Sequence, residues 1–203
     1  MKKIFIIMFF YVLTGPCSFA NEVGKMSISI MPGISVPVAG EWTNSSLLIY
    51  DSYGPINANY GAKTSFALTG AVDYRFHKMM TGGIELGYDF KHSTKYTNAI
   101  KTQIFHLTPF IRIDRTFDHW TPYGVLGIGY YNVKATVADN SSANGYLGFN
   151  LGTGIDYELT NELSVGLDIR WHHIFSNNSQ FGGAQPDINN IVPSVKFTYS
   201  FDI

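Results

Sequence analysis

Apolar and polar residues alternate one by one along much of the chain, most clearly at its carboxyl end. In residues 191–203 the odd positions are aliphatic or aromatic apart from one proline, whereas all the even positions but Val192 are polar. A repeat of two residues puts these sets on opposite faces of a β-strand. The same alternation recurs in residues 66–76, 84–90, 147–159 and 163–171. Each segment therefore predicts a strand with one apolar and one polar face.

Two further segments alternate less cleanly. Residues 26–38 carry apolar side chains mainly at even positions, but Pro32 and Pro37 cannot donate ladder hydrogen bonds and indicate a sheet edge, a bulge or a strand end. Residues 103–113 carry apolar side chains mainly at odd positions, with Phe110 as the exception. We predict a strand in both segments.

The segment around Leu126 is ambiguous, because one apolar set on even positions competes with another on odd positions. We place Leu126, Ile128 and Tyr130 on the apolar outer face. Gly127 and Gly129 then lie inside, where the absence of side chains relieves crowding.

These segments give eight strands, each close to the roughly 9–11 residues that a tilted strand needs to cross a bilayer. The connections alternate in length: short ones are expected at residues 77–81, 114–121 and 160–162, and long, polar ones at residues 39–61, 92–100, 136–145 and 176–190. Short turns on one side and long loops on the other are typical of outer-membrane barrels, with both termini in the periplasm. The predicted fold is all-β, an eight-stranded antiparallel up-and-down transmembrane β-barrel.

A soluble β-sandwich or lipocalin-type barrel also alternates, but it would bury its apolar face and show the polar one to water. Two features favour the membrane barrel. The apolar faces carry many aromatic residues near the strand ends, as aromatic girdles require. The polar faces combine small residues with charges of both signs, which suits a narrow lumen.

The amino terminus predicts export. Lys2 and Lys3 precede an apolar run at residues 4–13, and a polar, small-residue stretch ends at Ala20. This order is typical of a cleaved signal peptide, so we predict a signal at residues 1–20 and one barrel domain at residues 21–203. The only cysteine, Cys17, would leave with the signal. After it, no apolar run is long enough for a membrane helix.

Composition narrows the function classes. The formal net charge of −1 argues against a nucleic-acid partner, which would need a basic face. Charged residues make up 14% of the chain, against about 25% in soluble domains. Several of them fall on the predicted inner faces, with both signs present: Asp73, Arg75, Glu85, Asp89, Lys91, Arg112, Asp156, Glu158, Asp168, Arg170 and Lys196. Because eight strands leave an interior that side chains fill, we expect a structural charge network rather than a wide pore.

Residues 120–130, 148–158 and 167–174, which read WTPYGVLGIGY, GFNLGTGIDYE and LDIRWHHI, resemble the outer-membrane β-barrel domain family. That family includes opacity-type porin-like proteins and relatives of the transmembrane domain of outer-membrane protein A. The resemblance implies a bacterial outer-membrane location, contact with outer-membrane lipids and lipopolysaccharide, and loops that could meet an extracellular ligand or host surface. Residues 197–201 look like the terminal strand that the barrel-assembly machinery recognises, although this chain continues through Asp202 and Ile203.

His172 and His173, followed by Ser176 and Asn177, superficially resemble the His-x-Ser-Asn motif of lipid A 3-O-deacylases, which are also eight-stranded barrels. Here the spacing is one residue too long, so His173 and Ser176 would lie on opposite faces of a strand. The other histidines show no metal-ligand spacing. We therefore expect no catalytic, metal or cofactor site. The leading hypothesis is a structural or surface-interaction protein, with a narrow pore or transporter for small or hydrophobic solutes as the alternative and a lipid-modifying esterase as a third.

Overall fold

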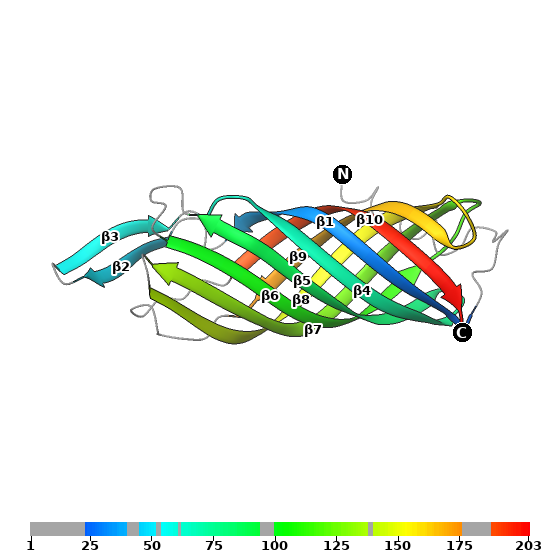
Figure 1. Cartoon of the computed structure of the whole chain (residues 1–203), viewed down its shortest axis with the longest axis horizontal. Coiled ribbons are helices and arrows are strands. Elements are labelled where there is room, and N and C mark those ends of the chain that lie inside the picture. Colours follow the sequence, from blue (N-terminus) through cyan, green and yellow to red (C-terminus); the bar gives the residue numbers. More distant parts are fainter. Residues whose placement is uncertain are drawn as a thin grey trace, which may run out of the picture.

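The computed structural model of the 203-residue chain describes residues 23–39, 45–51, 54–60, 62–93, 100–137, 140–175 and 188–203. Eight antiparallel strands close a barrel in the order β1-β10-β9-β8-β7-β6-β5-β4 (Figure 1), which confirms the predicted fold. Their bounds are β1 Lys25–Ala39, β4 Ser65–His77, β5 Met80–Ser93, β6 Ile100–Asp114, β7 Trp120–Val137, β8 Asn140–Glu158, β9 Leu163–Ile174 and β10 Ile188–Asp202. The predicted signal peptide lies outside the described residues. Within them, no helix is long and apolar enough to cross a membrane.

A separate hairpin stands at one end of the barrel. Among the described residues, β2 (Ser45–Asp51) and β3 (Gly54–Tyr60) pair with each other and with no barrel strand. In Figure 1 the hairpin projects from the end opposite the carboxyl terminus. The sequence predicted a plain loop over residues 39–61. That prediction was wrong, because the polar composition of the segment hid a pair of strands that is separate from the membrane barrel.

The barrel strands are longer than predicted, from 12 residues in β9 to 19 in β8. The largest difference is at the β7–β8 hairpin, where pairing continues to Val137 opposite Asn140. The long loop expected at residues 136–145 is therefore mostly strand. Strands that continue past a bilayer meet water on both faces, so they need no apolar alternation and their sequence reads as a loop.

The two faces of the strands divide as the alternation predicted. Leu126, Ile128 and Tyr130 point outward and are exposed, which confirms the chosen register of β7. Gly129 faces inward, where a side chain would collide with the backbone of Leu107 on β6. Phe110, the apolar residue that interrupted the alternation of residues 103–113, faces inward and packs in a small apolar cluster with Met31, Ala71 and Val125.

The two prolines of β1 behave differently. Pro37 precedes a register shift between Pro37 and Ala39, which confirms an irregularity there. Pro32, however, lies in the middle of β1, opposite Leu68 of β4, and pairing is continuous from Met26 to Ser35. The barrel has no edge at this strand, so the expected edge, bulge or strand end was wrong for Pro32. One missing amide donor is tolerated because the neighbouring residues on both sides remain paired.

One predicted lumen residue lies outside. The pairing of β5 with β6 shifts between Asp89 and His92, and this irregularity changes which residues face inward. Lys91, expected inside, is exposed, whereas His92 is buried. Strict alternation could not find this, because one extra residue reverses every later assignment on the strand.

Candidate functional site

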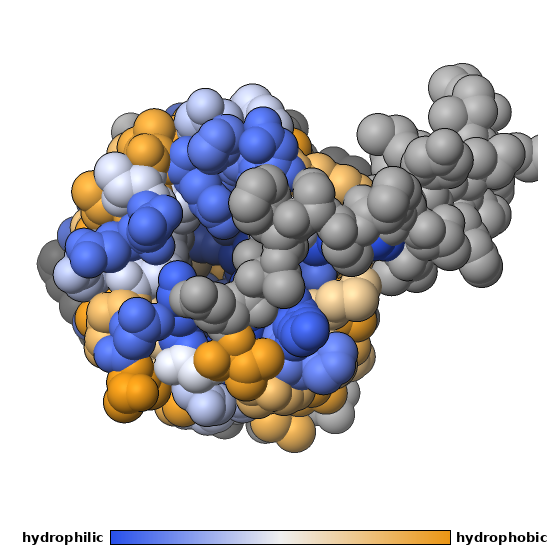
Figure 2. Space-filling model, turned by 90° about the vertical axis from the view of Figure 1, so that its right-hand side faces the viewer, coloured by the Kyte–Doolittle hydropathy of each residue, from blue (hydrophilic) through white to orange (hydrophobic). Residues whose placement is uncertain are grey.

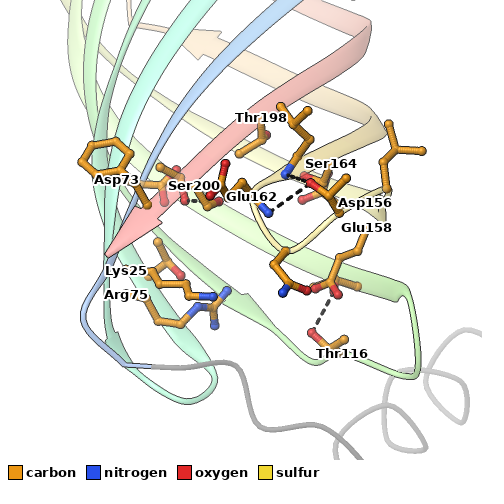
Figure 3. Close-up of a pocket in the computed structure, with 18 of the residues that line it drawn as sticks. Lys25, Asp73, Arg75, Thr116, Asp156, Glu158, Glu162, Ser164, Thr198 and Ser200 are labelled. Atoms are coloured by element: carbon orange, nitrogen blue, oxygen red, sulfur yellow. Dashed lines mark hydrogen bonds between the residues drawn. The ribbon is translucent and has the colours of Figure 1, made fainter. Parts of the chain in front are cut away.

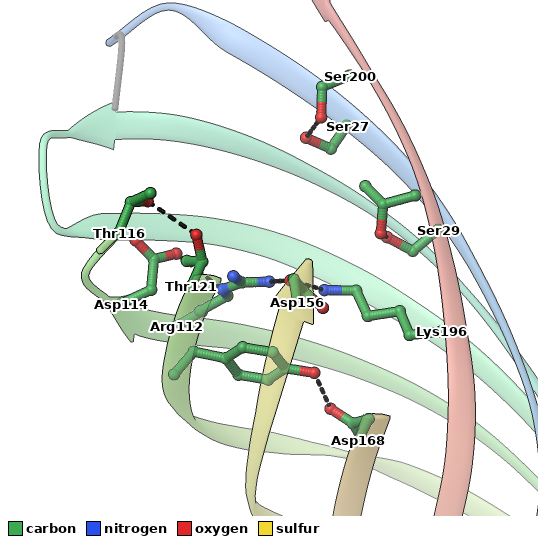
Figure 4. A network of polar contacts seen from close by, with 12 residues as sticks. Ser27, Ser29, Arg112, Asp114, Thr116, Thr121, Asp156, Asp168, Lys196 and Ser200 are labelled. Atoms are coloured by element: carbon green, nitrogen blue, oxygen red, sulfur yellow. Dashed lines mark hydrogen bonds and ion pairs between the residues drawn. The ribbon is translucent and has the colours of Figure 1, made fainter. Parts of the chain in front are cut away.

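Buried charged side chains fill the lumen in layers. The layer nearest the short turns, called the first layer, consists of Arg75, Arg112, Asp114, Asp156 and Lys196. Asp156 Oδ2 accepts hydrogen bonds from Arg112 at 2.7 Å and from Lys196 at 3.0 Å (Figure 4). Asp114 accepts from Arg112 at 2.7 Å and from Arg75 at 2.8 and 2.9 Å. These residues come from β4, β6, β8 and β10, so the ion pairs connect strands that are not neighbours in the sheet.

The second layer lies deeper and consists of Glu85, Tyr123, Asn150, Asp168 and Arg170. Arg170 donates to Glu85 at 3.0 Å and to Asp168 at 2.8 Å. Tyr123 donates its hydroxyl to Asp168 at 2.6 Å, and Asn150 donates to Glu85. Both carboxylates are almost completely buried, at 1% exposure each. Because every charge has an opposite partner, the layer can exist inside the barrel without the cost of an isolated buried ion.

A third group contains histidines. The rings of His106 and His172 lie 4.9 Å apart between centroids, and the His106 ring stacks on Tyr131 at 5.3 Å. The Tyr131 hydroxyl lies 3.1 Å from Nδ1 of His172. Asp89 accepts a hydrogen bond from Ser35 at 2.6 Å. Aromatic rings therefore fill this part of the lumen.

Apolar side chains close the lumen toward the long loops. The residues are Ala62, Ile104, Tyr131, Val133, Ile174 and Ile188, all buried, with Tyr146 packed against them. Ile174 ends β9 and Ile188 begins β10, which places this apolar plug at the long-loop end of the barrel. An apolar constriction of this kind opposes the passage of ions and water.

The opposite end of the lumen is hollow. A cavity of about 790 Å³ lies at the short-turn end, and Figure 2 shows hydrophilic residues around the hollow with apolar residues outside them. Asp73, Arg75 and Glu158 line it, together with Lys25 and Ser200 (Figure 3). A second cavity, of about 10 Å³ beside Arg170, has room for roughly one water molecule. The first layer lies at the boundary of the large cavity and separates it from the second layer.

The structure places ten of the eleven expected lumen charges on the inner side, with Lys91 as the exception. Arg75, Glu85, Arg112, Asp156, Asp168, Arg170 and Lys196 lie in the two layers, Asp89 lies beside Ser35, and Asp73 and Glu158 line the cavity. Sequence reasoning missed Asp114 and Tyr123. Asp114 lies two residues after Arg112 on the same face of β6, so the alternation could have predicted that it faces the lumen. Tyr123 lies on the strand whose register was ambiguous.

The two adjacent histidines lie on opposite faces of β9. His172 is buried in the lumen, whereas His173 faces outward, where its Nδ1 lies 2.8 Å from Oδ1 of Asn189. The His173 ring also contacts Phe149 and Phe175, at 5.2 and 4.7 Å between centroids. Ser176 lies outside the described residues. Among the described residues, no group of three histidine, cysteine or acidic side chains could hold a metal ion.

Comparison with known proteins identifies the family. The profile of the outer membrane protein β-barrel domain family matches residues 30–201. The chain belongs to this family. No curated protein matches it significantly.

Solved structures share the fold of this outer-membrane barrel at low sequence identity. Neisserial surface protein A (NspA) superposes with a TM-score of 0.60 at 13% identity, covering 91% of this chain and 100% of that one. The N-terminal β-barrel domain of Pseudomonas aeruginosa OprF gives 0.53 at 10% identity, covering 89% and 100%. The outer membrane protein AlkL, solved in DMPC lipid bilayers, gives 0.52 at 13% identity, covering 94% and 96%.

Family membership places this barrel in the bacterial outer membrane and orients its lumen. Short turns of such barrels face the periplasm and long loops face outside. We therefore expect the large cavity to open to the periplasm and the apolar plug to lie toward the exterior. Aromatic side chains lie toward both ends of the wall, as the interfacial girdles of such barrels do: Trp120 contacts Tyr157 near the short turns, and Phe149 contacts Trp171 near the long loops.

Proposed function

We propose that this outer-membrane barrel has a structural or surface-interaction role, exerted through its extracellular segments, and that its lumen does not conduct solutes. The observation that carries this proposal is the filled lumen: two ion-paired layers, the histidine group and the apolar plug follow one another between the periplasmic cavity and the exterior. A conductive path would have to break buried ion pairs and wet an apolar constriction.

The pairing pattern supports a structural role for the lumen charges. Arg170 of β9 pairs with Glu85 of β5, and Asp156 of β8 joins Arg112 of β6 to Lys196 of β10. These pairs connect strands across the barrel rather than within one hairpin. Arg170 and Glu85 therefore cross-link opposite walls, and Asp156 links β8 to the next-but-one strand on each side, in addition to the backbone ladder.

The extracellular side supports a surface role. The β2–β3 hairpin extends beyond the barrel end, and the β7–β8 hairpin continues to Val137 and Asn140. Paired strands hold an extended surface in place better than a flexible loop does, and binding residues are often carried on such projections from a rigid scaffold. A ligand or host surface outside the cell is the partner class that this arrangement fits.

Two measurements test the proposal. Purified protein in planar bilayers should show no steady conductance in potassium chloride, and proteoliposomes should not swell in glycine or arabinose. Bacteria that display the parent protein should adhere to a cultured cell monolayer more than bacteria that display a variant without residues 45–60. Steady conductance from the folded parent protein, or equal adherence of both strains, would contradict the proposed role.

The second candidate, a narrow pore or transporter, is favoured by the periplasmic cavity of about 790 Å³, which would serve as a vestibule. In that case the charged layers would be the barrier to movement. Glu85→Gln should then increase flux, because it releases Arg170 from its cross-barrel partner. Under the structural proposal, Glu85→Gln lowers stability and leaves flux at background.

A further inference from the structure

Three lysines gather on the outward surface of the barrel near its extracellular end. Lys101 lies on the same face of β6 as Phe105, and Lys134 lies on the same face of β7 as Tyr130. Both aromatic residues are exposed on the outer face of the barrel. Lys91 on β5 is turned outward by the irregularity between Asp89 and His92. The lysines thus lie on the three adjacent strands β5, β6 and β7.

The strand register places the three lysines around one residue, Gln103. Lys134 is paired directly with Gln103, and Lys101 lies two residues further along β6 on the same face. On the other side, pairing of Asp89 with Ile104 and of His92 with Thr102 puts Lys91 beside Gln103. With strands about 4.8 Å apart, Lys91 and Lys134 lie roughly 10 Å from each other across β6.

The described part of the chain offers no exposed acidic side chain near this cluster. Within the described chain, no carboxylate forms an ion pair with any of the three lysines, and the exposed acidic residues Asp118, Glu162 and Asp202 lie at the periplasmic end. A further lysine, the exposed Lys63, is held near the partly exposed Lys101 by the hydrogen bond from the Lys63 backbone amide to Ser93, the residue paired with Lys101. Among the described residues, the charged side chains on this sector of the barrel wall are therefore positive.

Aromatic residues directly below the lysines place the cluster at the membrane boundary. Tyr88 packs edge-on against Phe90 with ring centroids 4.9 Å apart, and Gln103 donates to the Tyr88 hydroxyl at 2.5 Å. Aromatic side chains of this kind lie at the level of lipid headgroups, and long lysine side chains above them extend their charges to the same level. A membrane lipid with an anionic head is thus the ligand class that fits this surface.

We propose that Lys91, Lys101 and Lys134 form a binding site for the phosphate groups of one lipopolysaccharide molecule in the outer leaflet. Lysine ammonium groups bind phosphate oxygens through charge-assisted hydrogen bonds, and basic pockets facing the membrane bind phosphorylated headgroups. Gln103 completes the site as a neutral hydrogen-bonding group between the lysines. The acyl chains would pack on the exposed aromatic and aliphatic surface below, which includes Phe105 and Leu107.

Native mass spectrometry of the folded, full barrel in detergent tests this site, with bis-phosphorylated lipid A as the probe and its dephosphorylated form as the reference lipid. The triple variant Lys91→Gln, Lys101→Gln, Lys134→Gln should bind phosphorylated lipid A on the order of 100-fold more weakly, and each single variant about fivefold more weakly. Lys78→Gln, which removes an exposed lysine from a periplasmic turn, is the matched control and should bind like the parent. Heat-modifiable gel mobility verifies that each variant is folded.

Three results would overturn the site: equal lipid A affinity of the triple variant and the parent, equal losses in the triple variant and Lys78→Gln, or equal affinity of the parent for both forms of lipid A. Phosphatidylglycerol added at the same concentration should compete poorly, and competition equal to that of lipid A would reduce the site to a general anionic surface and overturn it as well. The inference depends on barrel orientation and not on the proposed surface role. A variant without residues 45–60 should keep its lipid A affinity. Failure of the proposed surface role would therefore leave the lipid A site standing, and failure of the lipid A site would leave the surface role standing.

Discussion

Replacing Asp156 by asparagine tests whether the first layer stabilises the barrel. Asp156 is 5% exposed and is the shared acceptor of Arg112 and Lys196. In Asp156→Asn, Arg112 keeps Asp114 as a partner at 2.7 Å, but Lys196 loses its ion pair while it remains buried. Breaking a buried pair by removing one partner costs about 3–5 kcal/mol. Because Lys196 borders the large cavity, where water reduces the penalty, we expect the lower end, about 3 kcal/mol.

A second substitution separates the cost of the unpaired Lys196 ammonium group from the other effects of Asp156→Asn on stability. Lys196→Met alone leaves Asp156 paired with Arg112, so we expect a loss of about 1 kcal/mol. The double variant Asp156→Asn, Lys196→Met no longer contains the stranded ammonium group and should be more stable than Asp156→Asn alone. The coupling free energy in this double-mutant cycle should therefore be at least about 1 kcal/mol.

Equilibrium unfolding in urea from lipid vesicles, followed by tryptophan fluorescence and heat-modifiable gel mobility, measures these differences. Asp202→Asn makes the same chemical change at an exposed strand end and should alter the free energy of unfolding by less than about 0.5 kcal/mol. The reasoning is refuted if Asp156→Asn costs under about 1 kcal/mol, or if the two single effects simply add.

Three other predictions concern the lipid face, the extracellular hairpin and export. Leu167 is 60% exposed and lies between the aromatic ends of the wall, so Leu167→Arg should lower the free energy of unfolding by about 2–4 kcal/mol. Ser164→Thr, on the cavity side, should change it little. If unfolding from vesicles gave the reverse order, the assignment of the lipid and lumen faces would be wrong. Deleting residues 45–60 should leave heat-modifiable mobility unchanged, because the described hairpin pairs only with itself. Mass spectrometry of the mature protein should find Asn21 at its amino terminus, and retention of residues 1–20 would exclude cleavage.

The outward half of the fold was predictable because lipid imposes one rule on every exposed position. Residues such as Ile128 and Leu167 must be apolar wherever the wall meets acyl chains, so alternation is strong and continuous there. The rule ends where the wall meets water. The extensions of β7 and β8 and the β2–β3 hairpin therefore went unrecognised, and Lys91 was misplaced by an irregularity that leaves no mark in the alternation.

The sequence predicted which charged residues face the lumen, but not which of them form ion pairs with one another. Alternation identified Glu85 and Arg170 as inward charges, yet these residues lie on β5 and β9 and meet across the lumen. Which inward residues reach each other depends on the stagger of the closed barrel, which is a global property of all eight strands. Local periodicity gives the face of a residue but not its height along the barrel axis, so the two layers could not be assembled from the sequence.

Barrel closure itself depends on small polar residues where the first and last strands meet. β1 and β10 pair from Lys25 opposite Asp202 to Ala39 opposite Asn189, and Gly33 lies opposite Ser194. On the lumen side, Ser27 bonds Ser200 and Ser29 bonds Thr198, each at 2.9 Å.

A slip of two residues along this pairing would keep every side chain on its own face, so alternation alone does not prevent it. It would, however, separate the matched hydroxyl pairs and move Ser194 away from Gly33, the position where a side chain would collide with it. These pairs therefore select one register among those that the apolar faces allow. Since the stagger of the barrel follows from that register, they also fix which charges of the two layers meet across the lumen.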